Sequence, residues 1–160
     1  FSVCGGGAAP TLSLDVAGLG GTSWVRVETL RAEGAAAAVG RTFSGWGIPT
    51  AASVAIARRA RPRFKTIIAT GGVSSGLDVA KAIVLGAHAA GIARPVLQAY
   101  VAGGKASAVR FLQEVEAELR AAMLLVGARN VAALRKAPHL LFGRLRRWVK
   151  LAKKLEQGRR

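Results

Sequence analysis

Cysteine, aromatic residues and acidic residues are all scarce in this chain of 160 residues. The single cysteine, Cys4, excludes an intramolecular disulfide and a metal site built from several thiolates, so we expect a protein of the reducing cytoplasm. Aromatic residues make up 6% of the chain and apolar residues 51%. This composition favours closely packed helices and strands over a wide cavity lined with aromatic rings.

Long apolar runs and a signal peptide are also missing. Every apolar run stops short of the roughly 18 residues of a membrane span, so we expect a soluble protein. The start, FSVCGGGAAPTLS, has neither the basic flank nor the apolar stretch of a signal peptide, and it lacks an initiator methionine. We interpret the chain as part of a longer protein, of a length that suits one domain.

Positive charge is abundant and uneven. Lys and Arg number 24 against 8 Asp and Glu, which gives a net charge of +16. Residues 129–160 hold eleven of these cations against Glu156 alone, and residues 58–65 hold another five. Such a distribution fits either a solvated surface, the interpretation we favour, or a surface for nucleic acid or anionic membrane.

Short apolar strands alternate with helical patterns along the chain. The strands are predicted at 12–16, 66–69 and 89–92, each followed by glycine or proline. One helix is predicted from Pro49 and another over 105–125. The helix predicted over 75–86 ends at Gly86 and has Leu77, Ala80, Ile83 and Val84 on one face. A short helix is predicted after Asn130, which would cap it. Residues 25–42 show little periodicity and are predicted as a long loop.

This alternation predicts parallel strands joined by right-handed crossovers, an α/β fold. Three such units fit either a doubly wound sheet or part of a (β/α)8 TIM barrel. A whole barrel needs about 200–250 residues, so three strands cannot close one.

Glycine-rich turns follow each predicted strand, in DVAGLGGTSW, TGGVSSG and GIARP. Ligands of parallel α/β proteins bind at the carboxyl ends of the strands, where these turns meet. Glycine lets backbone N–H groups approach an anion, Ser74 and Ser75 could add hydroxyl donors, and Arg94 could add a forked charge. The turns therefore predict a phosphate site, although simple chain reversals remain the alternative. GLGGTSW lacks the spacing of a dinucleotide fingerprint.

The motifs LDVAGLGGTSWVRVE, WGIPTA, IIATGGVSSGLDVAKAIVLGA, AGIARPVL and VGARNVAALRKAP occur in this order. Together they resemble the carboxyl-terminal half of type 2, flavin-dependent isopentenyl-diphosphate isomerase, over about residues 12–143. The resemblance implies strands six to eight of a (β/α)8 barrel that binds FMN and interconverts isopentenyl and dimethylallyl diphosphate. It also implies NADPH as reductant of the flavin and Mg²⁺ on the substrate diphosphate.

By the same resemblance, the residues that contact FMN are Thr22, Gly71, Gly72, Val73, Ser74, Ala93 and Arg94. Ala17 stands where many relatives carry a serine, and Ser74 stands where an arginine is common. The family's proton-transfer and magnesium-binding residues have no counterpart here. We therefore assign no catalytic or metal-binding residue to this chain, which we expect to be inactive alone.

The remaining candidate residues have simpler interpretations. His88 and His139 lack a second ligand at metal-binding spacing, and Cys4 has no neighbouring charge that would activate it. Asp15 is predicted as a hydrogen-bond acceptor inside the barrel, Asp78 as a helix-start residue, and Glu114, Glu116 and Glu118 as a solvated helix face. Trp24 and Trp46 could border the flavin or anchor loops by packing.

Residues 144–160 depart from the resemblance, so we divide the chain into a half-barrel, 1–143, and a basic amphipathic helix or tail. Leu145, Trp148, Val149, Ala152 and Leu155 recur at helical spacing between cations. This helix could lie on an anionic membrane or partner, but packing by Trp148 is favoured. A complementary amino-terminal half or a second copy could complete the barrel. The alternatives are a non-catalytic binding module, a gene remnant, or a basic protein that binds anions or nucleic acid.

Overall fold

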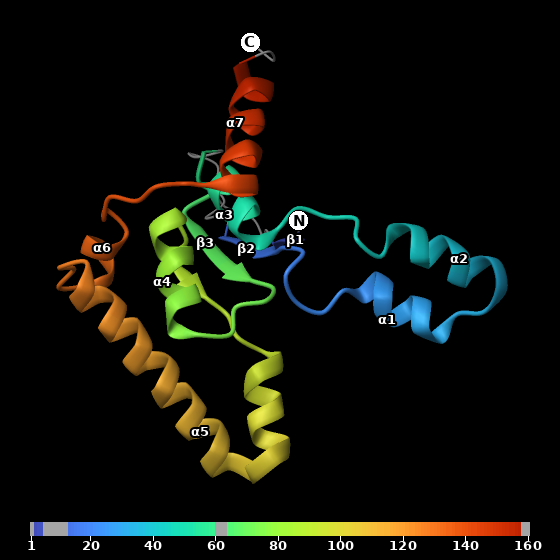
Figure 1. The fold of residues 1–160 in the computed structure, drawn as a ribbon, viewed down its shortest axis with the longest axis horizontal. Coiled ribbons are helices and arrows are strands. Elements are labelled where there is room, and N and C mark those ends of the chain that lie inside the picture. Colours follow the sequence, from blue (N-terminus) through green and yellow to red (C-terminus); the bar gives the residue numbers. More distant parts are fainter. Residues whose placement is uncertain (1, 5–12, 60–63, 158–160) are drawn as a thin grey trace.

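The computed structural model describes residues 2–4, 13–59 and 64–157 of the chain (Figure 1). The strands are β1 Ser2–Cys4, β2 Ser13–Ala17, β3 Thr66–Thr70 and β4 Ala89–Ala90. The helices are α1 Trp24–Arg31, α2 Gly34–Phe43, α3 Thr50–Arg59, α4 Gly76–Leu85, α5 Arg94–Leu125, α6 Val131–Leu134 and α7 Gly143–Gln157. Within these residues no helix combines the length and the hydropathy that crossing a bilayer would require.

The strands form one sheet in the order β1-β2-β3-β4. β2, β3 and β4 are parallel, with Leu14 opposite Ile67 and Val16 opposite Ala69. The predicted parallel α/β unit is therefore confirmed, and its three strands fit part of a TIM-barrel-type fold. β1 was not predicted, and it pairs antiparallel with the outer edge of β2.

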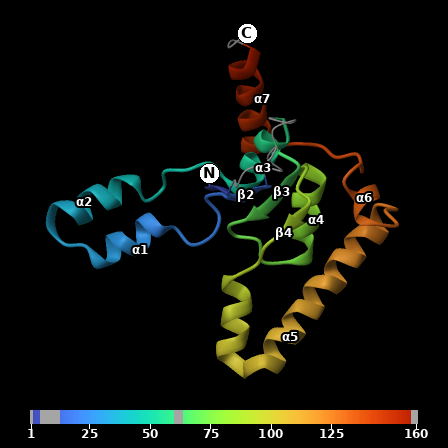
Figure 2. The same cartoon turned by 180° about the vertical axis from the view of Figure 1, so that it is seen from behind.

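The sheet buries one face and exposes the other. Leu14, Val16, Ile67 and Ala69 alternate along β2 and β3 and are buried beneath α3 and α4. Their neighbours Ser13, Asp15 and Ala17 point to the opposite face and are exposed. From behind, the sheet lies in front of α4 (Figure 2). A period-two apolar pattern thus produces a sheet covered by helices on one side only.

Helices α3 and α4 supply that cover. α3 starts after Pro49, as predicted, and buries Val54 and the alanines at 52, 55 and 57, whereas Ile56 is half-buried. α4 has Ser75 as its N-cap and ends at Gly86, whose φ of 122° suits glycine. Of the predicted apolar face of α4, Ala80 and Ile83 are buried. Leu77 is exposed, and Val84 is half-buried against the second core cluster.

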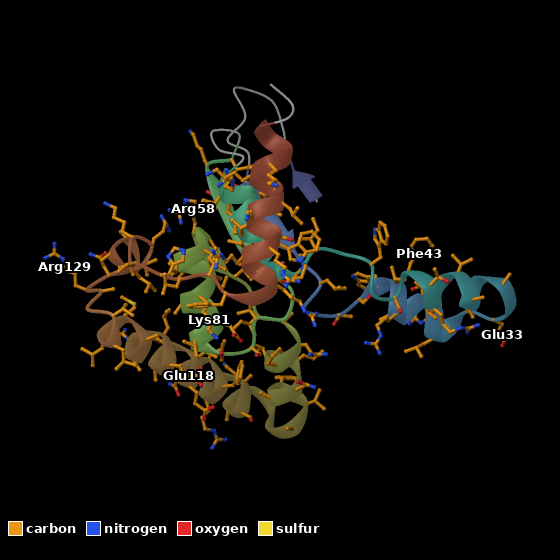
Figure 3. The ribbon with its side chains drawn as sticks, turned by 45° about the horizontal axis from the view of Figure 1, so that its top comes forward. Glu33, Phe43, Arg58, Lys81, Glu118 and Arg129 are labelled. Carbon is orange, nitrogen blue, oxygen red and sulfur yellow. The ribbon has the colours of Figure 1, made fainter. Side chains whose placement is uncertain are left out.

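The prediction of a long loop over residues 25–42 is wrong, because this segment forms the hairpin of α1 and α2. Ser23 caps α1 by accepting a hydrogen bond from the Arg26 N–H. In the sticks view the hairpin projects sideways, with Glu33 at its far end and Phe43 nearer the sheet (Figure 3). The two helices contact mainly each other, and only Ala37 of the pair is buried. The sequence did carry helical signals here, because Ser23 caps α1 and alanines dominate the first half of α2, but the prediction missed them.

The helix predicted over 105–125 begins earlier, at Arg94. α5 consists of two helical segments that meet at Gly103 and Gly104, whose φ angles are −157° and +64° (Figure 1). The predicted strand over 89–92 accordingly shortens to Ala89–Ala90, because the chain turns into α5. Only the later part of α5 packs on α4, through Leu119 and its neighbours, so the predicted apolar residues Val109 and Leu112 stay exposed.

The carboxyl-terminal helices form as predicted. The Asn130 side chain caps α6 by accepting from the Ala133 N–H at 2.8 Å. α7 packs on α3, and Leu145 and Val149 contact the main core. Trp148, the residue expected to anchor α7, is 36% exposed and does not belong to that core.

Candidate functional site

A cavity of about 340 Å³ lies where the loops after β2, β3 and β4 meet. It contains all seven residues predicted to contact a cofactor, namely Thr22, Gly71, Gly72, Val73, Ser74, Ala93 and Arg94. Five further lining residues were not predicted: Gly21, Thr70, Gly91, Ile92 and Pro95. They are direct chain neighbours of the predicted ones, so the loops as whole units, rather than isolated residues, form the cavity.

The glycines after β3 are required by their backbone conformation and by a close contact. Gly71 and Gly72 have φ angles of +89° and +85°, which side chains rarely adopt. The loop after β2 lies directly against them, and a Cβ on Gly20 would approach the Gly71 carbonyl oxygen to 2.7 Å. The Thr50 hydroxyl donates to that same oxygen at 2.5 Å. The two glycine turns therefore support each other, and α3 fixes the one after β3.

The N-terminus of α4, at one edge of the cavity, is occupied by its own side chains. Ser75 Oγ accepts from the Asp78 N–H at 3.1 Å, and Asp78 Oδ2 accepts from the Ser74 hydroxyl at 3.1 Å. Burial raises the pKa of Asp78, but hydrogen bonds from Ser75 and Ser74 and the charge of Lys81 outweigh it, so the pKa lies below its usual value. Both serine hydroxyls, predicted as possible phosphate donors, are engaged with Asp78.

Glu118 adds a second carboxylate at this helix end. Its Oε2 accepts from the Gly76 N–H at 2.6 Å, and it belongs to the part of α5 beneath α4 (Figure 3). Glu118 is exposed, as predicted, but the hydrogen bond to Gly76 was not predicted. The signal was hidden, because a contact between residues 42 positions apart depends on how α5 folds back. Two carboxylates offset the partial positive charge of the α4 N-terminus.

The N-terminus of α5 differs because no side chain caps it. Ala93 is the N-cap residue and Pro95 lies in the first turn, and Arg94 is exposed at the cavity. Among the described residues, the N–H groups of Gly72 and Val73 also donate no hydrogen bond. Unpaired N–H groups beside a guanidinium suit an anion. The positive potential of the cavity therefore comes from the β3 turn and the start of α5.

Thr70 connects the cavity to the exposed face of the sheet. Its hydroxyl donates to Asp15 Oδ1 at 2.7 Å, which joins the ends of β2 and β3. Asp15 is thus the acceptor that the sequence predicted, although it is exposed in this structure. Because the hydroxyl has acceptors in Asp15 and in the Val16 carbonyl, the Thr70 oxygen can itself accept from a ligand.

The other candidate residues lie elsewhere. The His88 Nδ1 accepts from the Ile67 N–H at 3.0 Å, which gives this histidine a structural role. Trp24 and Trp46 are 73% and 79% exposed and do not line the cavity. Across the described ranges, no group of three or more His, Cys, Asp and Glu could hold a metal ion. The side chain of Cys4 lies outside the part that is described.

Sequence relatives agree with the motif resemblance. The chain is 48% identical over 139 residues to an isopentenyl-diphosphate delta-isomerase of Metallosphaera sedula, covering 85% of this chain and 37% of that protein. It is 42% identical over 137 residues to the enzyme of the same name from Methanopyrus kandleri, covering 85% and 38%. The resemblance to isopentenyl-diphosphate isomerases is confirmed. This chain spans little more than a third of the length of these relatives.

Solved structures agree on the flavin-binding type of fold. A mandelate oxidase variant with a monooxide FMN adduct is 33% identical with a TM-score of 0.56, covering 59% of this chain and 30% of that one. Mandelate oxidase with benzoyl-formic acid is also 33% identical with a TM-score of 0.56, and the match covers 59% of this chain and 28% of that one. The profile of the family described as FMN-dependent dehydrogenase matches residues 36–140. The chain belongs to this FMN-dependent dehydrogenase family.

Proposed function

We propose that this chain is the part of a flavin-dependent isopentenyl-diphosphate isomerase that holds the phosphate of FMN. The observation that carries the proposal is the cavity where the β3 turn meets the start of α5, in a chain 48% identical to a named isomerase. The contacts proposed for FMN are made by Thr22, Gly71, Gly72, Val73, Ser74, Ala93 and Arg94.

Within this cavity the phosphate is expected nearer α5 than α4. Two carboxylates, Asp78 and Glu118, already occupy the α4 N-terminus and would repel an anion placed there. Arg94 and the N–H groups of Gly72 and Val73 carry no such competing charge. The Thr70 oxygen, an acceptor at the cavity wall, suits a hydroxyl of the ribityl chain next to the phosphate.

The activity proposed for the completed protein is the interconversion of isopentenyl and dimethylallyl diphosphate in the cytoplasm. FMN in its reduced state supplies the chemistry, with NADPH as the reductant and Mg²⁺ on the substrate diphosphate. The described residues offer no metal cluster, so the magnesium ligands and the proton-transfer groups are proposed to come from outside this chain. Here the chain's own residues bind and orient the flavin phosphate.

Completion of the barrel is part of the proposal. The uncovered face of the sheet carries Ser13, Asp15 and Ala17, and in a barrel such a face is the interior. α5 and the hairpin expose further apolar side chains, among them Leu97, Val101 and Leu30. We propose that a complementary half with the remaining strands covers these surfaces. A second copy of this chain is the alternative, and sedimentation of the isolated chain distinguishes them.

The test is FMN binding, with riboflavin as the ligand that lacks the phosphate. We expect the chain to bind FMN more tightly than riboflavin. Arg94→Ala should weaken FMN binding about 10–100-fold, as expected for the loss of about 1.5–3 kcal/mol from a charged hydrogen bond, without changing riboflavin binding. Arg110→Ala, which removes an exposed arginine of the same helix outside the cavity, is the matched control.

Equal affinity for FMN and riboflavin would contradict the phosphate site. Isomerase activity is the second measurement, made on this chain alone with FMN, NADPH and Mg²⁺. We expect no turnover, because the proton-transfer groups are supplied elsewhere. Turnover by the isolated chain would contradict the proposal that it acts only as part of a completed barrel.

A further inference from the structure

Helix α7 carries two packed apolar residues and a group of exposed cations. Leu145 and Val149 contact the main core, and α7 lies against α3. At about 100° per residue, five cations occupy an arc of about 120° that begins about 40° from Val149, whereas a sixth exposed cation, Arg144, lies outside this arc. The five cations of the arc define the basic surface and are Arg146, Arg147, Lys150, Lys153 and Lys154, all exposed.

None of these five cations forms a hydrogen bond or ion pair with another described residue through its side chain. The ion pairs that are present lie on other helices, between Arg120 and Glu116 and between Arg31 and Glu28. Like charges three or four residues apart on a helix repel each other. Arg146 and Lys150, and also Lys150 and Lys154, have this spacing. The basic surface is therefore uncompensated within the described chain, and an anionic partner would relieve the repulsion.

The packing of α7 narrows the class of partner. An amphipathic helix binds a membrane by burying its apolar face in the lipid. In α7 Leu145 and Val149 of that face already contact the protein core and are not free to enter lipid, although Trp148 and Leu151 remain exposed. The five exposed cations are then the main feature that a partner would recognise, which favours a polymer with closely repeated negative charges.

We propose that the basic surface of α7 binds the phosphate backbone of nucleic acid without sequence preference. From Arg146 to Lys154 the helix rises about 12 Å, which is the width of the major groove of B-DNA. Duplex DNA offers one charge per about 1.7 Å of its axis, so several phosphates lie within reach of the five cations. Arg and Lys to phosphate are contacts that position a protein without reading bases.

The basic surface is separate from the proposed flavin site. In both ribbon views α7 rises on one side of the sheet, whereas the loops before α4 and α5 lie on the other (Figures 1 and 2). Loss of one activity should therefore leave the other intact. The proposal about nucleic acid does not depend on FMN binding.

The test is the binding of a labelled DNA duplex, measured by fluorescence anisotropy between 50 and 200 mM salt, roughly the range over which such binding weakens steeply. We expect dissociation constants of about 10⁻⁴–10⁻⁶ M and a slope of log K against log salt of up to about −4.5, at about −0.9 per phosphate contact. The double variant Lys150→Gln/Lys154→Gln should flatten the slope by about 1.8. Glutamine keeps helix propensity, and circular dichroism verifies the fold.

The matched control is Lys105→Gln/Arg110→Gln, which removes the same charge from exposed positions on α5. It should leave the slope unchanged. An equal change of slope in both double variants would show that binding responds to net charge alone, and this result would overturn the proposal. A lack of DNA binding at about 50 mM salt, the lowest concentration of the series, would overturn it as well. Vesicles of phosphatidylglycerol and poly-glutamate are the competing ligands. Binding to either as tight as to DNA would also overturn it.

Discussion

The sheet with α3 and α4 differs from the α1–α2 hairpin in how its helices are held. In the sheet region, apolar residues such as Leu14, Val54 and Ile67 are buried almost completely. In the hairpin, the side chain of Leu30 is 87% exposed and that of Trp24 is largely exposed. At the end of α2, Phe43 packs edge to face on the exposed Trp46, with 5.9 Å between the ring centroids. The sheet region is a core that this chain completes by itself, whereas the hairpin has no such core.

This contrast separates the residues that hold the cavity from those that border it. The β3 turn is fixed by backbone contacts with the loop after β2 and by Thr50 of α3, all within the packed region. The hairpin extends from the other end of that loop. The proposed phosphate site is therefore supported by the stable part of the molecule, and the hairpin can vary without displacing it.

The largest expected difference in stability is between leucine-to-alanine substitutions in the sheet region and in the hairpin. Leu14→Ala should lower the free energy of unfolding by about 2–5 kcal/mol, because it leaves a cavity in the core. Leu30→Ala should change it by less than about 0.5 kcal/mol, since the side chain is exposed. Urea denaturation followed by circular dichroism measures both. A large loss at Leu30 would mean that a partner copy covers the hairpin in solution.

A smaller difference in stability is expected between two glycine-to-alanine substitutions at positions with positive φ. Gly72→Ala should cost roughly 2–4 kcal/mol, because the φ of +85° is unfavourable and the new Cβ would collide with Gly20. Gly34→Ala, in the hairpin at φ +56° with open space around it, should cost only about 1–2 kcal/mol. The same denaturation experiment compares them. Equal costs would show that the loop after β2 moves aside readily.

The smallest effect concerns pH and the N-terminus of α4. Because the pKa of Asp78 is lower in the folded than in the unfolded chain, its stabilising contribution is present above the unfolded value of about 3.9. The contribution is lost as the pH falls through the lower, folded value. Asp78→Asn should therefore reduce stability at pH 7 by about 0.3–1 kcal/mol, as is typical for a charge at a helix N-terminus, and the difference should vanish in acid.

The control for Asp78 is Glu114→Gln, which removes an exposed carboxylate of α5. It should change stability at pH 7 by less than about 0.5 kcal/mol, as surface substitutions usually do. A difference between Asp78→Asn and the wild type that persists unchanged in strong acid would contradict the ionic role. It would point instead to the hydrogen bonds with Ser74 and Ser75 as the whole effect.

Much of the fold and of the candidate site could be predicted because the signals are local. Short apolar runs bounded by glycine placed β2 and β3, Ser75 and Gly86 bounded α4, and Asn130 started α6. The turn glycines placed the cavity, since parallel strands end at one edge of a sheet. The contacts to FMN assigned by resemblance stay predictions.

The missed features depend on partners distant in the sequence. α1 and α2 pack on each other without a periodic apolar face, and Glu118 reaches Gly76 only after α5 bends at Gly103 and Gly104. The antiparallel pairing of β1 with β2 likewise left no local signal.

The sequence by itself determined which segments alternate as strand and helix, where the glycine turns lie, and that cations gather at the carboxyl end. Only the tertiary structure decided that carboxylates occupy the start of α4 while the start of α5 stays open, and that Leu145 and Val149 of α7 are used for packing. The physical reason is range: backbone conformation and periodicity act over a few residues, whereas electrostatic compensation and burial depend on which distant side chains the fold brings together.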